Sequence, residues 1–362
     1  MSEVLSVLDE IENRGQPISH EQLERLSGPS RSEGRLFADR LSQLPEARRL
    51  EIVSTLAYHA REDFALTFDE IFRACLDDKS PQVRRQAIEA LWEDERIDLA
   101  SRLVELVRED PSSEVREAAA SSLGRFVFMA ECGELPQPRG QQVREALERI
   151  IRSDQEALEV RRRAVESIAF INDAAVRQII DRAYGDEHDE MRISAVFAMA
   201  RSADRFWAET VQAELHSDLP AMRLEAARAC GEIALRSAIS RLVSMIDEDR
   251  DEDVQRMAVW ALGQIGGTRA RRALEQLLEG ESLALAEAAE KALDEMDFMH
   301  ESLDLIVLDL SEQEMIEEGN IQDRETSEYR REFHRYVDEN EDQDGGDDED
   351  DEDWPDEFLE IG

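Results

Sequence analysis

Seven stretches of this chain repeat one pattern at a nearly constant spacing, and this repeat restricts the possible folds more than any other feature. The first stretch, SPQVRRQAIEALW, has its first apolar anchor residue at Val83, and the anchors of the other copies follow at steps of 32, 45, 31, 31, 32 and 31 residues. A more divergent copy, PEARRLEIVSTLAYHA, precedes them. Such a period predicts a stack of similar structural units. The anchors are Val83, Val115, Val160, Met191, Met222, Val254 and Leu285.

Within each copy the apolar residues have helical spacing. An alanine stands four residues after every anchor, and an apolar residue stands eight after it. Positions 0, 4 and 8 share one face of an α-helix, so they predict a buried stripe. A constant alanine indicates that two helices approach closely there. The alanines are Ala87, Ala119, Ala164, Ala195, Ala226, Ala258 and Ala289.

Other amphipathic segments lie between these helices, at residues 97–107, 238–246 and 271–278. Each unit is therefore predicted to consist of one of these segments (helix A), a turn, and a helix that carries an anchor (helix B). The fold class predicted is all-α, an α-α superhelix. The longest step contains FVFMAECGELPQPRG (residues 126–140), an insertion whose two prolines predict a loop.

The turns have a charged signature. An arginine follows the anchor in five copies, and an aspartate stands six residues before three of these arginines, at Asp78, Asp110 and Asp186. Asp154 and Asp218 are displaced by one residue. We expect the aspartate to cap helix B and the arginine to reach the neighbouring turn, which gives a ladder of charge-assisted hydrogen bonds. The arginines are Arg84, Arg116, Arg161, Arg192 and Arg223.

This pattern resembles a HEAT-repeat protein of the short-repeat kind, similar to the phycobilin-lyase HEAT-like family, over roughly residues 36–300. The resemblance implies an armadillo-like helical solenoid of about eight helical pairs. Residues 1–35 are then expected to form an N-terminal helical cap. The family includes chromophore lyases, a hydroxylase and scaffolds, so the resemblance alone leaves the function open.

Charge distinguishes the end of the chain from the rest. The formal charge of the whole chain is −43, and residues 301–362 contribute strongly to it, with 26 acidic residues and only four arginines. Twelve of the sixteen residues at 338–353 are acidic, which predicts a largely disordered tail. Such a charge disfavours binding to nucleic acid or to an anionic membrane. Three widely spaced cysteines, without a CxxC pair, are typical of a reducing compartment, so we expect a cytoplasmic protein.

Catalytic and metal-binding motifs are missing from the sequence. The resemblance implies one kind of metal site, because the hydroxylase of that family binds iron through His-Glu pairs on successive repeats. This chain has such pairs only at His20–Glu21 and His300–Glu301, outside the repeats. The segment NEDQDGGDDEDD (residues 340–351) departs from a calcium loop at Asp347 and Asp351. We therefore expect no catalytic residues, no specific metal site and no cofactor.

The free face of helix B is the candidate binding surface. Offset 6 from the anchor reads Phe197, Arg228 and Trp260 in three consecutive copies. Ile193, Leu224 and Arg256 stand at offset 2, and Phe170 and Arg201 at offset 10. Aromatic and arginine side chains are common interface anchors. The alternative is that these residues pack against other parts of the chain.

These observations favour a non-catalytic intracellular scaffold or adaptor that binds a partner protein of unknown identity on the concave face. The alternative is a lyase, a hydroxylase or an accessory of one. Within the tail, Trp354, Phe358 and Leu359 form a candidate recognition motif, or else are incidental apolar residues in a solvating segment.

Overall fold

A computed structural model of the chain describes residues 3–12, 17–280 and 282–298, and all regular structure among them is helical. These residues divide into two compact units, one before and one after the boundary between Leu235 and Arg236. The first unit contains α1 (Glu3–Ile11), α2 (His20–Leu26), α3 (Arg31–Leu41), α4 (Glu46–Glu62), α5 (Asp69–Cys75), α6 (Pro81–Ala90), α7 (Ile97–Glu109), α8 (Ser113–Glu131), α9 (Gln137–Ile151), α10 (Leu158–Ile168), α11 (Ala174–Tyr184), α12 (Asp189–Arg201), η1 (Arg205–Trp207), α13 (Ala208–Glu214) and α14 (Pro220–Glu232).

The second unit begins with a short 3-10 helix, η2 (Arg236–Ala238). It continues with α15 (Ile239–Glu248), α16 (Glu252–Ile265) and α17 (Gly267–Leu278). A last described helix occupies residues 283–298. The predicted all-α fold of stacked helical pairs is thus confirmed.

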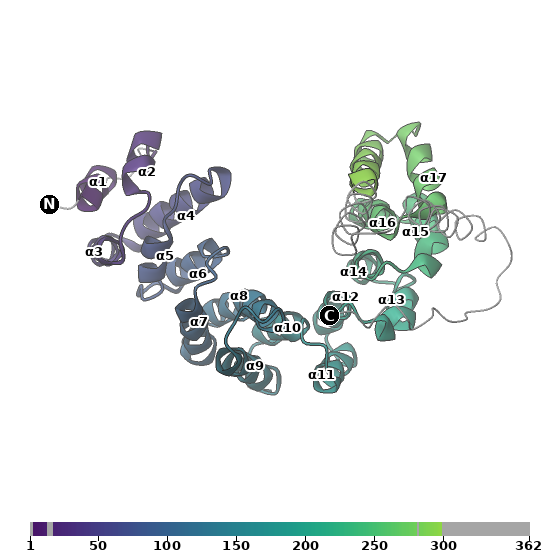
Figure 1. The fold of residues 1–362 in the computed structure, drawn as a ribbon, viewed down its shortest axis with the longest axis horizontal. Helices are drawn as coiled ribbons and strands as arrows, with labels where there is room; N and C mark the ends of the chain where they lie inside the picture. The colour runs from purple at the N-terminus through teal and green to yellow at the C-terminus, as the bar shows by residue number, and fades with distance from the viewer. Residues whose placement is uncertain (1–2, 13–16, 281, 299–362) are drawn as a thin grey trace, which may run out of the picture. The chain divides into compact units, whose positions relative to one another are not determined.

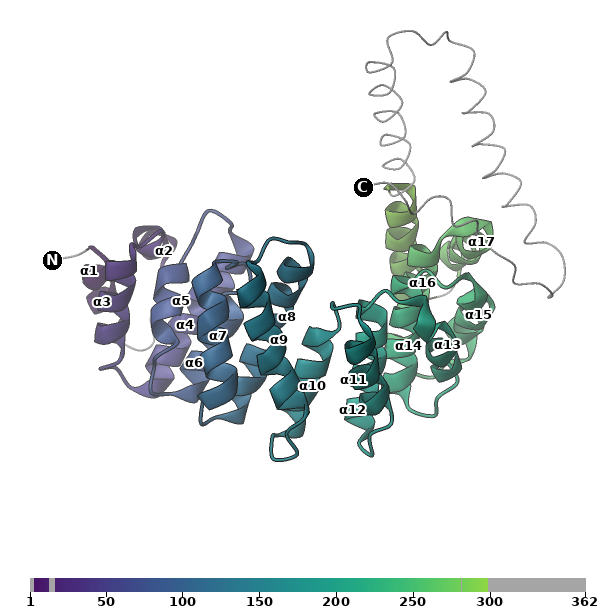
Figure 2. The same cartoon turned by 60° about the horizontal axis from the view of Figure 1, so that its bottom comes forward.

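Two layers of helices build the first unit. One, which we call the B layer, consists of α4, α6, α8, α10, α12 and α14, and each of these helices packs against the next. The helices between them in sequence form the A layer, where α3 packs against α5 and α7 against α9. Figures 1 and 2 show the two layers, and in Figure 1 the helices α4, α6, α8 and α10 line the inner side of this unit's curve.

The constant alanines lie in the buried cores of the two units. All seven have no exposed surface, as the sequence predicted. The anchors are equally buried in the first six copies, whereas Leu285 and Leu293 in the last copy are only half-buried. The last copy lacks a following repeat among the described residues, which explains its greater exposure.

The turns of the first unit are joined by the predicted ladder of arginine–carboxylate pairs. Arg84 binds Asp110 of the next turn through Nε and Nη2, at 2.8 and 2.7 Å, while its Nη1 donates to the carbonyl of Asp78 in its own turn at 2.8 Å. Arg116 makes the same contacts with Glu156 and with the carbonyl of Asp110. In the divergent first copy, Arg49 binds Asp78. Each of these arginines thus fixes two consecutive turns, which confirms the predicted ladder for Arg84 and Arg116. Arg161 only approaches Asp186, and Arg192 pairs with Asp189 on its own helix.

Two details of the turns differ from the prediction. The aspartates do not cap helix B: Asp78 and Asp110 accept the N–H groups of Ser80 and Ser112, and those serines occupy the N-cap positions. The aspartate therefore orders the turn before the helix begins. In addition, the acid bound by Arg116 is Glu156 and not Asp154, because the longer side chain reaches the guanidinium from a position nearer the helix.

The insertion is also more helical than predicted. Helix α8 continues to Glu131 and α9 begins at Gln137, which leaves only residues 132–136 as a loop. The apolar run from Phe126 to Met129 contains no helix breaker, so it extends α8. The prolines stand at the start of α9, where a missing backbone N–H breaks no hydrogen bond.

The predicted domain limits remain a prediction. Helices α1 and α2 lie within the N-terminal cap predicted at residues 1–35, but α3 runs across its limit. The two compact units divide the predicted solenoid of residues 36–300 at residue 235. The predicted acidic tail at residues 301–362 lies outside the described residues.

Candidate functional site

A group of stacked arginine and phenylalanine side chains occupies the B layer of the first unit. Phe197 on α12 lies between two guanidinium groups: the Cζ of Arg228, on α14, is 4.1 Å from its ring centroid and the Cζ of Arg201 is 4.4 Å away. All three side chains are half-buried. Both distances are well within the roughly 6 Å range of cation–π attraction.

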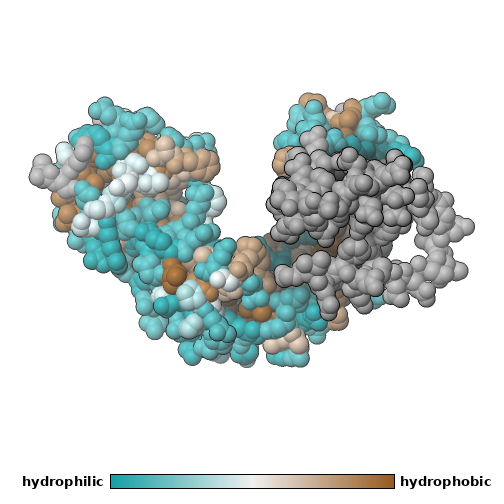
Figure 3. Space-filling view, in the orientation of Figure 1, coloured by the Kyte–Doolittle hydropathy of each residue, from teal (hydrophilic) through white to brown (hydrophobic). Residues whose placement is uncertain are grey.

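The stack continues towards the N-terminal repeats. Arg201 also covers the ring of Phe170, at 4.8 Å, and Phe170 contacts Phe128 of α8 with the ring centroids 5.3 Å apart. Phe128 is half exposed. These five residues, Phe128, Phe170, Phe197, Arg201 and Arg228, form what we call the arginine–phenylalanine cluster, and they come from four consecutive repeats. Figure 3 shows hydrophobic surface over α8 and α10 on the inner side of the first unit.

The two arginines of the cluster are held in different ways. Arg228 is paired with Glu225 at 2.7 Å and with Glu232 on its own helix. Arg201 donates to the backbone carbonyl of Glu166 at 3.2 Å and makes no ion pair among the described residues. Burial lowers the pKa of Arg201, and the positive charge of Arg228 lowers it further, although Glu166 opposes both effects. Arg201 is therefore a partly desolvated cation to which a carboxylate would be attracted.

A buried polar network lies below the cluster. The Glu166 carboxylate accepts from Ser194 at 2.6 Å and from Arg163 at 2.7 Å, and Arg162 donates to the Ser194 hydroxyl at 2.9 Å. These bonds join α10 to α12. Since a buried polar network is rigid when its members are satisfied, it supports the helices that carry the cluster.

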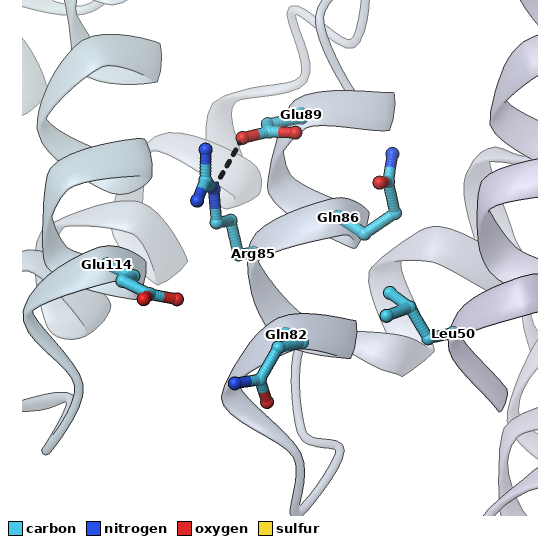
Figure 4. A pocket seen from close by; sticks show the side chains of 6 residues that line it. All are labelled: Leu50, Gln82, Arg85, Gln86, Glu89 and Glu114. Carbon is cyan, nitrogen blue, oxygen red and sulfur yellow. Dashed lines mark hydrogen bonds and ion pairs between the residues drawn. The ribbon is translucent and has the colours of Figure 1, made fainter. Parts of the chain in front are cut away.

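Farther along the same layer, α4, α6 and α8 border a polar hollow of about 240 Å³. Figure 4 shows Arg85 beside the hollow, donating to Glu89 at 2.8 Å, while Leu50 lies on the opposite wall. The lining is mostly charged or amide side chains, and one cation is already paired. The hollow offers little apolar surface, so it is a weaker candidate for ligand binding than the cluster.

The predicted site residues are distributed over three parts of the chain. Arg201 and Arg228 both contact Phe197, and Ile193 and Leu224 lie half-buried on the same two helices. Trp260 and Arg256 lie on α16 of the second unit, where Trp260 is half-buried and Arg256 pairs with Asp253. The tail residues Trp354, Phe358 and Leu359 lie outside the described residues.

The sequence placed Phe170 at offset 10 beside Arg201, and in the structure the two side chains stack. The predicted site did not include Phe128. Phe128 belongs to the insertion that was predicted to be a loop, and it reaches the cluster only because α8 is extended. Uninterrupted helix-forming residues after Phe126 were the available signal.

Two negative findings concern the described residues. Among them, no three His, Cys, Asp or Glu side chains are grouped as ligands of a metal ion. No helix in the same part of the chain has the length and apolar character needed to cross a membrane.

Residues 68–157 and 208–294 match the family of HEAT repeats. No curated protein matches the chain. Among solved structures, human deoxyhypusine hydroxylase is 17% identical, with a TM-score of 0.33 and coverage of 73% of this chain and 97% of that one. The complex of CpcE and CpcF of phycocyanin lyase from Nostoc is 17% identical, with a TM-score of 0.44 and coverage of 64% and 94%. The Kap95:Nup1 complex is 16% identical, with a TM-score of 0.47, and the match covers 83% of this chain but only 48% of that one.

Proposed function

Because two regions of this chain match HEAT repeats, we propose that it is a non-catalytic scaffold that binds a partner protein on the B layer of its first unit. The observation that carries the proposal is the arginine–phenylalanine cluster. It places two cations and three phenyl rings in a continuous stack across four repeats.

Side chains of this kind suit a protein interface. Arginine and aromatic residues supply much of the binding energy at interfaces, because they bury a large area and combine apolar and polar contacts. The stacked rings are held by their neighbours, so little side-chain entropy is lost on binding. Arg201, which has no carboxylate partner among the described residues, favours a partner with an acidic side chain next to apolar ones.

The remaining predicted residues extend the proposal. Ile193 and Leu224 add apolar surface beside Phe197, and Trp260 and Arg256 provide a second contact surface on α16. The tail residues Trp354, Phe358 and Leu359 act as a separate recognition motif. We place this scaffold in the cytoplasm, without binding to nucleic acid, membrane or a specific metal.

Affinity capture of the full-length protein followed by mass spectrometry tests the proposal. The double variant Phe128→Ala/Phe197→Ala should lose at least one partner that the wild type captures stoichiometrically. Phe206→Ala is the matched control, since Phe206 is an exposed aromatic that also stacks with an arginine, Arg177, but lies outside the cluster. For a purified partner, Phe197→Ala should weaken binding by about tenfold or more.

A folded double variant that keeps every partner of the wild type would contradict this site. The enzymatic alternative has its own test, which is elemental analysis for iron and a search for bound chromophore in the purified protein. Iron bound in stoichiometric amount, or a retained chromophore, would overturn the scaffold proposal.

A further inference from the structure

The fourth rung of the arginine ladder differs from the first three. At Arg49, Arg84 and Arg116 the edge formed by Nε and Nη2 binds a carboxylate through both nitrogens. At Arg161, on α10, the nearest carboxylate contact is a 3.7 Å approach of Nη2 to Asp186. The Arg161 Nε is buried and has no hydrogen-bond partner among the described residues. A buried donor without a partner is costly, so this edge attracts an acceptor.

His188 explains why Asp186 does not close the rung. In the first two rungs the acidic residue is followed two positions later by Ser80 and Ser112, whose backbone N–H it accepts. Asp186 likewise accepts the backbone N–H of His188, at 3.0 Å, but the same oxygen also binds the His188 Nδ1 at 2.8 Å. The imidazole therefore draws Asp186 away from Arg161.

A cavity of about 330 Å³ lies beside this edge, between α9, α10, α11 and α12. Its apolar lining includes Val165, Ile179 and Met191. Arg182 also lines it and makes no ion pair among the described residues, although Asp154 and Asp186 contribute negative charge. The cavity combines an apolar wall with two arginines, of which Arg161 has only the 3.7 Å approach to Asp186 and Arg182 has no ion pair among the described residues. This is an arrangement for a small amphipathic anion.

We propose that this cavity binds a carboxylate on a short aliphatic stem, which accepts hydrogen bonds from Nε and Nη2 of Arg161 as Asp78, Asp110 and Glu156 do in the other rungs. The stem packs on Val165 and Ile179, and Arg182 adds a second positive charge. The carboxylate belongs either to a free short-chain acid or to an acidic side chain of a peptide. This site is separate from the arginine–phenylalanine cluster, so it does not depend on the scaffold proposal.

Nitrogen-15 NMR of the arginine Nε–H groups in the full-length protein measures the binding directly. The resonance that is lost in Arg161→Lys identifies Arg161. We expect this resonance to shift saturably with sodium butyrate, with a synthetic peptide of residues 338–353, or with both, and the two titrations distinguish the sources. Sodium chloride at equal ionic strength is the control for adventitious ions.

His188→Ser is the decisive variant, because it installs the residue found in the first two rungs. Asp186 should then close on Arg161, and binding of the active probe should weaken by about tenfold or more. The variant should fold, since serine is a better helix N-cap than histidine. The proposal is overturned if neither probe shifts the Arg161 resonance, if chloride shifts it equally, or if folded His188→Ser binds the probe as the wild type does.

Discussion

The rungs of the ladder require arginine, because its planar guanidinium donates in two directions at once. Arg84 uses Nη1 for the carbonyl of its own turn and the Nε–Nη2 edge for Asp110 in the next turn. A lysine has one ammonium group and no such edge. The side chains of Arg84 and Asp110 are only 9% and 4% exposed, so neither charge has water as an alternative partner.

Removing one partner of a buried arginine–carboxylate pair should therefore destabilise the fold severely. For Arg84→Ala we expect a loss of about 3–5 kcal/mol in the free energy of unfolding, because Asp110 is left buried without its cation. Arg192→Ala is the control, since Arg192 pairs with the half-exposed Asp189 and should cost less than about 1 kcal/mol. Urea denaturation of both variants measures the difference. Equal losses would show that the rung contributes nothing beyond a surface pair.

His188 has a pKa that its neighbour controls. Its hydrogen bond to Asp186 raises the pKa of the imidazole above the usual value of 6.5. A raised pKa in the folded state means that the pair stabilises the fold at pH values below 6.5 and that this contribution is lost as the pH rises through the folded pKa. In Asp186→Asn, a proton NMR titration should give a lower pKa for His188 than in the wild type. An unchanged value would exclude control by Asp186.

The sequence identified most of these residues and missed those whose contacts depend on side-chain length or on atomic distances. Spacing was sufficient to assign Arg84 and Arg116 to the turns, because a periodic sequence places equivalent residues in equivalent positions. It did not reveal that Glu156 replaces Asp154, since this depends on side-chain length. The hydrogen bond between His188 and Asp186 is also seen only from atomic distances, because the pattern of residue types does not predict it.

At the scale of helices, the constant alanines set the spacing between neighbours. Each helix B has one in its buried stripe, and none of the seven has exposed surface. The burial of these alanines was predictable, because a residue of the same small size in every copy indicates that neighbouring helices are separated by the same short distance. The extension of α8 was not predicted, since the two prolines suggested a loop and their place at the start of α9 is set by the length of α8.

Enlarging one of these alanines should separate two helices. We expect Ala226→Leu on α14 to lower the free energy of unfolding by about 1–3 kcal/mol or more, because the added carbons have no space. Ala221→Leu, at an exposed position of the same helix, should change it by less than about 0.5 kcal/mol. Thermal unfolding followed by circular dichroism compares the two. Similar melting temperatures for both variants would contradict the role of the alanine.

At the scale of the whole molecule, the chain divides into two compact units, and the most extensive helix contacts among the described residues join helices that are near in sequence. The sequence predicted one continuous array, because its period continues without a break across residue 235. The division at residue 235 follows from contacts in three dimensions, which the period of a sequence does not predict. The cluster is similarly a property of assembly: Phe128 and Arg228 are distant in sequence, and only stacking brings them onto one surface.

Damage to one unit should remain local. Leu274 in α17 has no exposed surface, and Leu274→Ala should destabilise the second unit by about 2–5 kcal/mol. In a linear array a repeat depends mainly on its neighbours, so amide protection should fall in α15–α17 and remain unchanged in α6 and α8. Native-state hydrogen exchange with mass spectrometry resolves these segments. An equal loss of protection in α6 would show that the chain unfolds as a single cooperative body.

The ladder described above also has a direction, since Arg49, Arg84 and Arg116 each donate forward to the acid of the following turn. A whole repeat carries one donor and one acceptor. Loss of the segment from Asp78 to Glu109 would therefore bring Arg49 opposite Asp110, with the chemistry of the contact intact. Gene duplication or deletion in steps of one repeat preserves the pairing, whereas a step of half a repeat destroys it. The turns thus let the chain change in length during evolution while its internal connections stay the same.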